Sequence, residues 1–495
     1  MDGPMILSAL ASALTPANLL YLLAGSVLGI IIGAAPGLGP VFGLAILLSM
    51  TFSMPVEGAL IFLSAVYAAS VYGGSITAIL LNTPGTPGSV ATCFDGFALS
   101  KRGEAGRALG ISTMSSFIGG VVGVLALALL GPLLAQASLL IGPSEFFMLA
   151  VAGLALVALA SKGNTVKGII MSGMGLMLSF VGRSVVTGER RFTFGTIYLE
   201  DGMQFVPIVI GLFALAQAMV LANESGTIAP LKKKVSGVWT GCKDVLKNPL
   251  TVIRSSVLGT VIGIVPGLGI NAANFIAYVV EKNASKDPDS FGQGNVRGII
   301  APEAANNAVT SAALIPAFGL GVPGSSTAAL FLSALMIQGL QPGYAFFSSG
   351  NDLFPTIVWG MLFAQVAFLV LGLLGARYFA KITQVPNSIL VPFILSLSVV
   401  GSFALRGQMM DVVVMIVAGV AGYYLQKNGY PLACLILGLI LGNLAEDNFC
   451  RAMRISRNSL SIFFTRPVSL VLILVIVFAF VWPVLKKHLF RQKAA

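Results

Sequence analysis

Long apolar runs separated by short polar or Pro-Gly interruptions recur along this chain from Asn18 to Leu485. The runs are blocks of Leu, Ile, Ala, Val and Gly, without the alternation of apolar and polar positions that is typical of membrane β-strands. Such runs are typical of helices in a bilayer, where the backbone must satisfy its own hydrogen bonds. The pattern therefore predicts an all-α polytopic membrane protein with about 11–13 membrane segments.

One of these runs occurs twice. Ser26–Gly39 reads SVLGIIIGAAPGLG, and Ser256–Gly269, 230 residues later, reads SVLGTVIGIVPGLG, so ten of the fourteen positions are identical. A second match pairs Pro87-Gly-Ser with Pro323-Gly-Ser at an offset of 236 residues. The two matches together indicate an internal duplication.

Each copy of the repeated run is interrupted by Pro-Gly-Leu-Gly. As helices, the arms on either side would be roughly 16–25 Å long, which is short of a hydrocarbon thickness of ~30 Å. We therefore expect helix–break–helix hairpins that enter the membrane partway. Their arms are Ala17–Gly33 and Val41–Met54 in the first copy, and Val252–Val265 and Asn271–Glu281 in the second.

A second break is expected after each hairpin. In the first half it takes the form of Tyr72-Gly-Gly-Ser-Ile-Thr77 followed by Asn82-Thr-Pro-Gly-Thr-Pro-Gly-Ser89. In the second half it is Gly319-Leu-Gly-Val-Pro-Gly-Ser-Ser-Thr327. Each unit is thus predicted to contain a hairpin and a broken helix.

The basic residues of the loops predict opposite orientations for the two units. They follow the first unit, in Lys101–Arg107, whereas in the second unit they lie between the hairpin and the broken helix, in Glu281–Arg297. Because basic loops face the cytoplasm, the two units are expected to be inverted relative to each other, as is typical of secondary transporters. We divide the chain into a first repeat (1–107), intervening helices (108–251), a second repeat (252–351) and C-terminal helices with a basic tail (352–495).

Composition excludes several classes of function. The 495 residues are 56% hydrophobic and 9% charged, and basic cytoplasmic loops explain the net charge of +11 without nucleic-acid binding. The single histidine, His488, lies in the basic tail, and the four cysteines lack the spacing of a disulfide or zinc site. No G-x-x-x-x-G-K-[ST] motif is present for ATP hydrolysis. We expect no cofactor beyond a co-transported sodium ion or proton.

The Pro-Gly breaks are the candidate binding site. They free backbone N–H and C=O groups, which a membrane tolerates only where protein or a water-filled cavity satisfies them. Surface turns are the alternative, but four related breaks flanked by Ser, Thr and Asn favour a site, in which helix N-termini would attract a carboxylate and free carbonyls could hold sodium. The predicted substrate-binding residues are Asn82, Thr83, Gly85, Thr86, Gly88, Ser89, Gly324, Ser325, Ser326 and Thr327. The predicted hairpin tips and candidate ion site are Pro36, Gly37, Gly39, Pro266, Gly267, Gly269, Asn271, Asn274, Asn306 and Asn307.

Several polar residues have competing explanations. Glu303, Asn306 and Asn307 either line the site or belong to a helix start near the interface, and Asn271 is also a candidate N-cap. Other charged residues are expected to be structural: Asp95 as a cap or as a partner of Lys101 or Arg102, and Glu446 as a partner of Arg451.

A series of motifs, taken in order, resembles the large membrane subunit of the tripartite tricarboxylate transporters, from the N-terminal hairpin to about Ser456. Two departures, at Arg183-Ser184 and at Gln217, replace expected acidic residues, and we expect them to affect outer-loop contacts or subunit docking more than the central site. The motifs are Pro36-Gly-Leu-Gly39, Tyr72-Gly-Gly-Ser-Ile-Thr77, Asn82-Thr-Pro-Gly-Thr-Pro-Gly-Ser89, Asp95-Gly96, Lys101-Arg-Gly-Glu-Ala-Gly106, Arg191-Phe-Thr-Phe-Gly195, Ala301-Pro-Glu-Ala-Ala-Asn-Asn307 and Gly321-Val-Pro-Gly-Ser325.

The resemblance implies the import of citrate-like or other carboxylates across a bacterial inner membrane, driven by sodium or protons. It also implies a small four-span membrane subunit and a periplasmic substrate-binding protein. From the residues we expect a permease that works by alternating access. An anion channel or a carboxylate exporter that uses the same breaks is the alternative, and an intramembrane enzyme is disfavoured because no catalytic cluster recurs in the core. The carboxylate, the coupling ion and a homodimeric state are left open.

Overall fold

The computed structural model describes residues 3–35, 37–160, 165–184, 186–223, 236–266, 268–348, 352–382, 386–404 and 406–491. Their regular structure is helical apart from one two-stranded ribbon. Eight of the described helices are long and apolar enough to cross a bilayer. These features confirm the prediction of an all-α polytopic membrane protein.

The chain forms two compact units. Unit 1 consists of Met1–Ala135 and Val206–Tyr423, and unit 2 of Gln136–Phe205 and Tyr424–Ala495. These units are defined by contacts between residues, whereas the division predicted from the sequence, with boundaries at residues 107, 251 and 351, follows the proposed repeats. That division therefore stays a prediction.

Unit 1 contains both copies of the repeated run. Its N-terminal helices are α1 (Gly3–Ala13), α2 (Pro16–Ala34), α3 (Gly39–Leu47), η1 (Leu48–Ser53), α4 (Val56–Leu81), η2 (Pro87–Ser89), α5 (Val90–Lys101) and most of α6 (Ala105–Ser138). Its later helices are α10 (Phe205–Val209), the π-helical η3 (Ile210–Leu215), α11 (Ala216–Asn223), α12 (Val238–Leu246), α13 (Pro249–Ile264), α14 (Gly269–Asn283), η4 (Pro288–Ser290), α15 (Arg297–Ala312), α16 (Leu314–Leu320), α17 (Ser326–Ile337), α18 (Tyr344–Ser348), α19 (Leu353–Ile382), α20 (Asn387–Ala404) and α21 (Met409–Lys427).

Unit 2 is a smaller helical body in which α7 packs against α8, α22 and α24. Its ribbon is antiparallel, with Gly182 opposite Arg191 and Arg183 opposite Arg190. The elements are α7 (Pro143–Ala160), α8 (Thr165–Ser179), β1 (Gly182–Arg183), β2 (Arg190–Arg191), α9 (Ile197–Glu200), α22 (Leu432–Ile455), α23 (Ile462–Thr465) and α24 (Pro467–Arg491).

Ion pairs hold the ribbon of unit 2 in place. The Arg191 guanidinium donates to both carboxylate oxygens of Glu446, at 2.7 and 2.9 Å, whereas Arg451 pairs with Asp447 one turn away. The predicted Glu446–Arg451 pair is therefore wrong, because the ribbon supplies a better placed, bidentate partner. A hydrogen bond from Arg183 lowers the pKa of the Glu200 carboxyl, so this second pair persists to more acidic pH.

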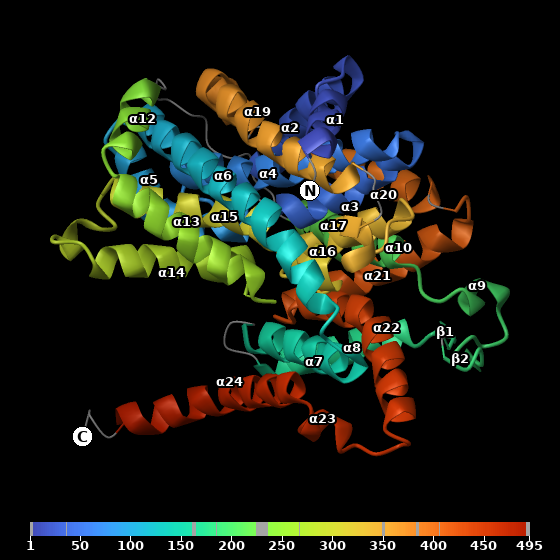
Figure 1. The fold of residues 1–495 in the computed structure, drawn as a ribbon. Helices are drawn as coiled ribbons and strands as arrows, with labels where there is room; N and C mark the ends of the chain where they lie inside the picture. The colour runs from blue at the N-terminus through green and yellow to red at the C-terminus, as the bar shows by residue number, and fades with distance from the viewer. Residues whose placement is uncertain are drawn as a thin grey trace. The chain divides into compact units, whose positions relative to one another are not determined.

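Both hairpins form within a few residues of the expected bounds. The first consists of α2 and α3, and the second, which lies beside α15 in Figure 1, consists of α13 and α14. The 19 residues of α2 give it a length of about 28 Å, and it is one of the eight helices long enough to span. The second arm has nine α-helical residues in α3 and continues as the 3-10 helix η1 to Ser53, so the two arms of this hairpin differ in helix type and length.

The expected break at Tyr72–Thr77 is wrong, because α4 continues through it to Leu81. Its two glycines serve close packing instead. A Cβ on Gly73 would lie 2.6 Å from the carbonyl oxygen of Ile30 in α2, and one on Gly74 would lie 2.5 Å from the Cγ2 of Thr86. These two glycines of α4 therefore allow neighbouring segments to pack closely and do not interrupt the helix.

The helices α4 and α15 form the centre of unit 1. From Gly58 to Leu80 every residue of α4 is buried, and in α15 the same holds from Gly298 to Ala312. Glycines of the first hairpin arms allow this, since a Cβ on Gly29 would lie 2.8 Å from the Val66 carbonyl oxygen and one on Gly259 2.4 Å from that of Ala305. Each hairpin thus packs its first arm against a fully buried helix of its own half.

We expect Gly33→Ala to destabilise unit 1, because the added Cβ would lie 2.0 Å from the carbonyl oxygen of Ser70 in α4. Overpacking of this kind costs about 1–3 kcal/mol. Thermal unfolding of the purified protein in detergent measures the effect. The matched control is Gly173→Ala in α8, where the new methyl group would meet nothing within 4 Å. Equal melting temperatures for the two variants would contradict the close packing of α2 on α4.

Candidate functional site

The Pro-Gly breaks have the same backbone hydrogen bond in both halves. The Gly85 amide donates to the carbonyl of Gly74 at 3.1 Å, and the Gly324 amide donates to the carbonyl of Ala313 at 3.2 Å. Each bond ties the extended segment at the Pro-Gly break back to the buried helices before it, at Gly74 within α4 and at Ala313 between α15 and α16. The backbone of both breaks is therefore fixed inside the protein, as a membrane requires.

The same two glycines touch the hairpins. A Cβ on Gly85 would lie 2.2 Å from the Gly33 carbonyl oxygen, and one on Gly324 would lie 2.5 Å from that of Gly263. Gly85 and Gly324 are 239 residues apart, so these contacts match Pro84-Gly-Thr with Pro323-Gly-Ser. The offset of 236 inferred from the sequence is therefore wrong, because Thr-Pro-Gly-Thr-Pro-Gly-Ser offers two Pro-Gly pairs and only the first occupies this position.

A short helix starts directly after each break. Thr86 and Ser89 form a capping box, in which the Ser89 hydroxyl accepts from the Thr86 amide at 3.4 Å; this hydroxyl also donates to the Thr86 carbonyl at 2.8 Å. In the second half the Ser325 hydroxyl accepts from the Ala328 amide at 3.1 Å and caps α17. The remaining N–H groups of these first turns present the positive ends of α5 and α17.

The hairpin tips lie beside the breaks. A Cβ on Gly39 would lie 4.0 Å from Thr86, and one on Gly269 would lie 3.6 Å from Ser325. In addition, η2 packs against α14 of the second hairpin and α17 packs against α3 of the first. The structure thus brings both predicted hairpin tips and both breaks together. Among the predicted tip residues, Pro36 and Gly267 lie outside the described residues.

Two neighbouring asparagines of α15 are buried, and Asn306 lies at this region. Asn306 and Asn307 are 0% exposed, and neither side-chain amide has a hydrogen-bond partner in the described part of the chain. A Cβ on Gly88 would lie 2.6 Å from the Asn306 Oδ1 and 2.2 Å from the side chain of Ile270, so this amide lies where the first break meets the second hairpin. Unpartnered buried amides are rare and costly, so they indicate a place for a ligand.

The two asparagines of the second hairpin have different surroundings. The Asn274 Oδ1 accepts from the Ala91 amide at 3.0 Å in the first turn of α5, while its Nδ2 is buried without a partner. Asn271 is exposed and is the third residue of α14, which begins at Gly269. The N-cap explanation for Asn271 is therefore wrong, and Asn274 is the asparagine that joins the second hairpin to the start of α5, after the first break.

Glu303 is buried one turn before these asparagines, in the second turn of α15, and is 0% exposed. A helix start near the interface is therefore the wrong explanation for it. Its carboxyl group accepts hydrogen bonds from four hydroxyl groups that the sequence analysis did not single out, those of Ser75, Thr92, Ser112 and Ser116. The spacing of Ser112 and Ser116, one turn apart on an apolar helix, is the signal that could have identified them.

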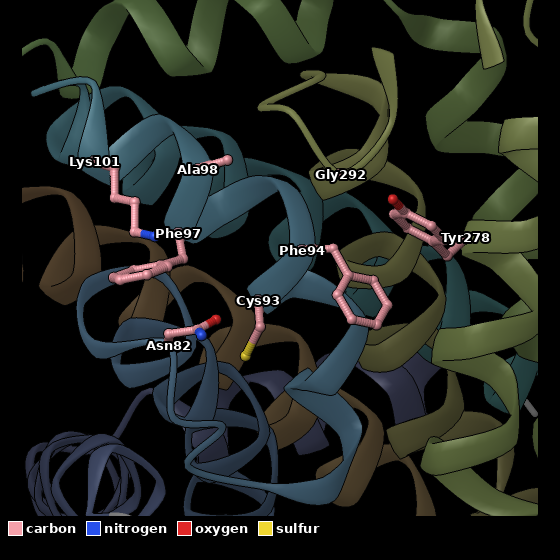
Figure 2. Close-up of a pocket in the computed structure, with 8 residues that line it drawn as sticks. All are labelled: Asn82, Cys93, Phe94, Phe97, Ala98, Lys101, Tyr278 and Gly292. Carbon is pink, nitrogen blue, oxygen red and sulfur yellow. The ribbon is translucent and has the colours of Figure 1, made fainter. Parts of the chain in front are cut away.

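A cavity of about 330 Å³ lies beside Asn82, at the start of the first break. The other residues that line it belong to α5, α14 and the loop before α15. Asn82 and Lys101 border it together, as Figure 2 shows, and the Lys101 ammonium lies 4.8 Å from the centre of the Phe97 ring. Asn82 ends α4 in a left-handed conformation with φ 57°. The exposed Asn82 thus faces this cavity, whereas Gly88 contacts the hairpin.

Gln217 lies at the tip of the first hairpin. A Cβ on Gly37 would lie 2.3 Å from the Gln217 Nε2, and Gln217 is the second residue after a π-helical segment, Ile210–Leu215, in which the helix widens. Gln217 was expected to affect outer contacts, but the structure places its amide beside the site.

Asp95 joins the two halves of unit 1 rather than capping a helix or pairing with Lys101 or Arg102. Its Oδ1 accepts from the backbone amides of Gly292, Gly294 and Asn295 at 2.9, 2.8 and 2.7 Å. Its Oδ2 accepts from the Tyr278 hydroxyl at 2.9 Å. The four donors satisfy the buried carboxylate, so it needs no basic partner.

Comparisons with known proteins agree with the resemblance. Residues 19–437 match the family described as "Tripartite tricarboxylate transporter TctA family". A protein of Agrobacterium vitis, described as "Uncharacterized 52.8 kDa protein in TAR-I ttuC' 3'region", is 36% identical over 92% of this chain and 91% of its own length. A second Agrobacterium vitis protein, from the TAR-II ttuC' 3' region, is 36% identical over 43% of this chain and 87% of its own length. No solved structure matches.

We expect Asp95→Ala to release the loop before α15, because it leaves three backbone amides without an acceptor. The cost is roughly 3 kcal/mol or more, whereas Asp95→Asn keeps an acceptor oxygen and costs about 1–2 kcal/mol. Hydrogen–deuterium exchange of residues 291–296 measures the release. Exchange in Asp95→Ala as slow as in the wild type would contradict the tether.

Proposed function

Because this chain belongs to the tripartite tricarboxylate transporter TctA family, we propose that it is the large permease subunit of a binding-protein-dependent secondary importer of carboxylates in a bacterial inner membrane. The observation that carries the proposal is the amide of Asn306, which is buried where the first break meets the second hairpin and, like that of Asn307 beside it in α15, has no partner among the described residues. Such amides need a ligand with complementary hydrogen-bonding groups.

A carboxylate fits the chemistry of this region. The first turns of α5 and α17 provide N–H donors and positive dipole ends, and the amides of Asn306, Asn307 and Asn274 add side-chain donors. None of the predicted binding residues carries a positive charge. A di- or tricarboxylate would then need a co-transported cation to offset part of its charge.

The predicted binding residues take two roles in this proposal. Gly85, Thr86, Gly88 and Ser89, with Gly324, Ser325, Ser326 and Thr327, hold the carboxylate at the breaks. The exposed Asn82 lines instead the cavity beside Lys101, and the exposed Thr83 follows it in the chain. This cavity serves as a vestibule where an ammonium group attracts the anion.

Alternating access of two inverted repeats is the transport mechanism we propose. The recurring contacts of Gly85 and Gly324 support a duplicated construction, and the loop charges support its inversion. The tripartite family implies partner subunits and a substrate-binding protein. We propose that these are a small four-span membrane subunit and a periplasmic protein, and that a homodimer is a further assembly to test.

Uptake of a labelled carboxylate panel into proteoliposomes tests the function. The vesicles hold this chain with its small partner subunit, with and without a purified binding protein, under an inward sodium or proton gradient. We expect uptake that requires both the binding protein and a gradient. Gradient-independent flux without the binding protein would contradict the proposal and support the alternative, an anion channel or a carboxylate exporter.

We expect Asn306→Ala to weaken carboxylate binding about tenfold or more, the equivalent of one hydrogen bond to a charged group. Asn82→Ala, Ser89→Ala and Ser325→Ala should also weaken binding while leaving membrane insertion normal. Isothermal titration of the purified protein measures the affinity. Asn448→Ala, whose amide donates only to the Leu444 carbonyl of its own helix, is the matched control. Equal affinities for Asn306→Ala and this control would remove Asn306 from the site.

A further inference from the structure

We propose that Glu303 and the four hydroxyl groups around it form a proton-binding site that is loaded and unloaded in each transport cycle. This inference rests on the proposed function and specifies its coupling ion. Glu303 Oε1 accepts from Ser75 at 2.6 Å and from Thr92 at 2.5 Å. Its Oε2 accepts from Ser112 at 3.0 Å and from Ser116 at 2.8 Å.

Glu303 has no basic partner among the ion pairs of the described residues. Glu281 of α14 is equally buried, but it pairs with both Arg254 and Arg297. An ionised carboxylate without such a partner is costly inside a protein, and more so in a membrane. Of these two buried glutamates, Glu303 is therefore the one whose charge a proton would more readily remove.

The other titratable groups near Glu303 cannot offset its charge. On α4 and α5 these are Tyr72 and Cys93, which are neutral or negative. The part of α6 that contacts it supplies hydroxyl groups. Among the charged groups of α15 and of the other elements packed on it, Arg254 and Arg297 pair with Glu281 of α14, and Asp95 of α5 accepts from Tyr278. Lys101 and Lys282 lie in the last turns of α5 and α14, and Lys101 is at the opposite end of α5 from Thr92.

Hydroxyl groups suit a carboxyl group that changes its protonation state. Each can donate to a carboxylate or rotate to accept from a carboxylic acid, so the same four groups satisfy both forms. A bound sodium ion would have to separate hydroxyl oxygens that lie 2.5–3.0 Å from the carboxyl oxygens. A proton needs no such opening, and the compact cluster therefore favours a proton.

The proposed proton site and the proposed carboxylate site are built on the same helices. Glu303 precedes Asn306 and Asn307 by three and four residues, which places all three on one face of α15. Ser75 follows Gly74, whose carbonyl holds Gly85 at the break, and Thr92 lies in the first turn of α5. A change in the protonation of Glu303 therefore acts on the elements that would bind the carboxylate. Binding of the proton and binding of the carboxylate are linked in this way.

Carboxylate affinity as a function of pH tests the site. We use the purified chain with its small partner subunit, a labelled citrate-like tricarboxylate, and a range from about pH 7 to 9, where carboxylic acids in water stay ionised. One proton bound together with the substrate makes the affinity fall by about tenfold per pH unit above the pKa of the site. In Glu303→Gln, which imitates the protonated form, the affinity should be independent of pH.

The control and the second variant keep the inference falsifiable. Glu57→Gln, at the start of α4, removes a glutamate away from the cluster and should keep the wild-type slope. Removing two donors in Ser112→Ala/Ser116→Ala disfavours the ionised carboxylate and should move the transition about one unit to higher pH. Infrared difference spectra should contain the band of a protonated carboxylic acid that Glu303→Gln lacks.

The outcomes separate this inference from the proposed function. If the wild type binds none of a panel of carboxylates, the proposed function fails, and the site at Glu303 loses its premise. If the wild type binds a carboxylate but Glu303→Gln keeps its pH slope, only the proton site is overturned. A sodium dependence of binding at constant pH that Glu303→Gln abolishes would also overturn the proton assignment, in favour of a metal cation. In vesicles, we expect Glu303→Gln to exchange substrate but to lose at least tenfold of the accumulation that a pH gradient drives.

Discussion

The complete burial of α15 is the constraint on which unit 1 depends. Fifteen consecutive residues from Gly298 to Ala312 are buried, yet they include a glutamate and two asparagines. Polar groups in such a helix must be satisfied by neighbouring helices, because neither lipid nor bulk solvent reaches them. The hydroxyl groups of α4, α5 and α6 satisfy Glu303. The amides of Asn306 and Asn307 have no such partners among the described residues. On the same helix, one polar group is therefore fully satisfied, whereas two others are left for the ligand that we propose.

The approach of the surrounding helices depends on small residues. The first arms of both hairpins place glycine against the backbone of α4 or α15, and α6 does the same, since a Cβ on Gly119 would lie 2.0 Å from the Ala304 carbonyl oxygen. Without these glycines the hydroxyl groups of α6 could not reach the Glu303 carboxyl. Close packing and the polar cluster are therefore two consequences of the same sequence feature.

The sequence was sufficient to predict the helices, both hairpins and the family, because apolar runs and Pro-Gly interruptions are local signals. It was insufficient where partners come from distant parts of the chain. The glycines at Tyr72–Thr77 looked like a break, but their neighbours in α2 and at Thr86 make them packing positions. The partners of Asp95 lie almost 200 residues away and are mostly backbone amides, which leave no mark in a sequence. The hydroxyl groups around Glu303 were missed for the same reason.

The hydrogen bonds between the two halves of unit 1 limit where rigid-body motion could take place. Asp95 in α5 accepts hydrogen bonds from the loop before α15, and Asn274 of α14 accepts one from the start of α5. Glu303 of α15 accepts hydrogen bonds from side chains of α4, α5 and α6. A boundary between the two proposed repeats would separate the partners of these bonds. The two halves of unit 1 are therefore joined by buried hydrogen bonds between their polar residues. The hinge of any rigid-body motion has to lie elsewhere than at this boundary.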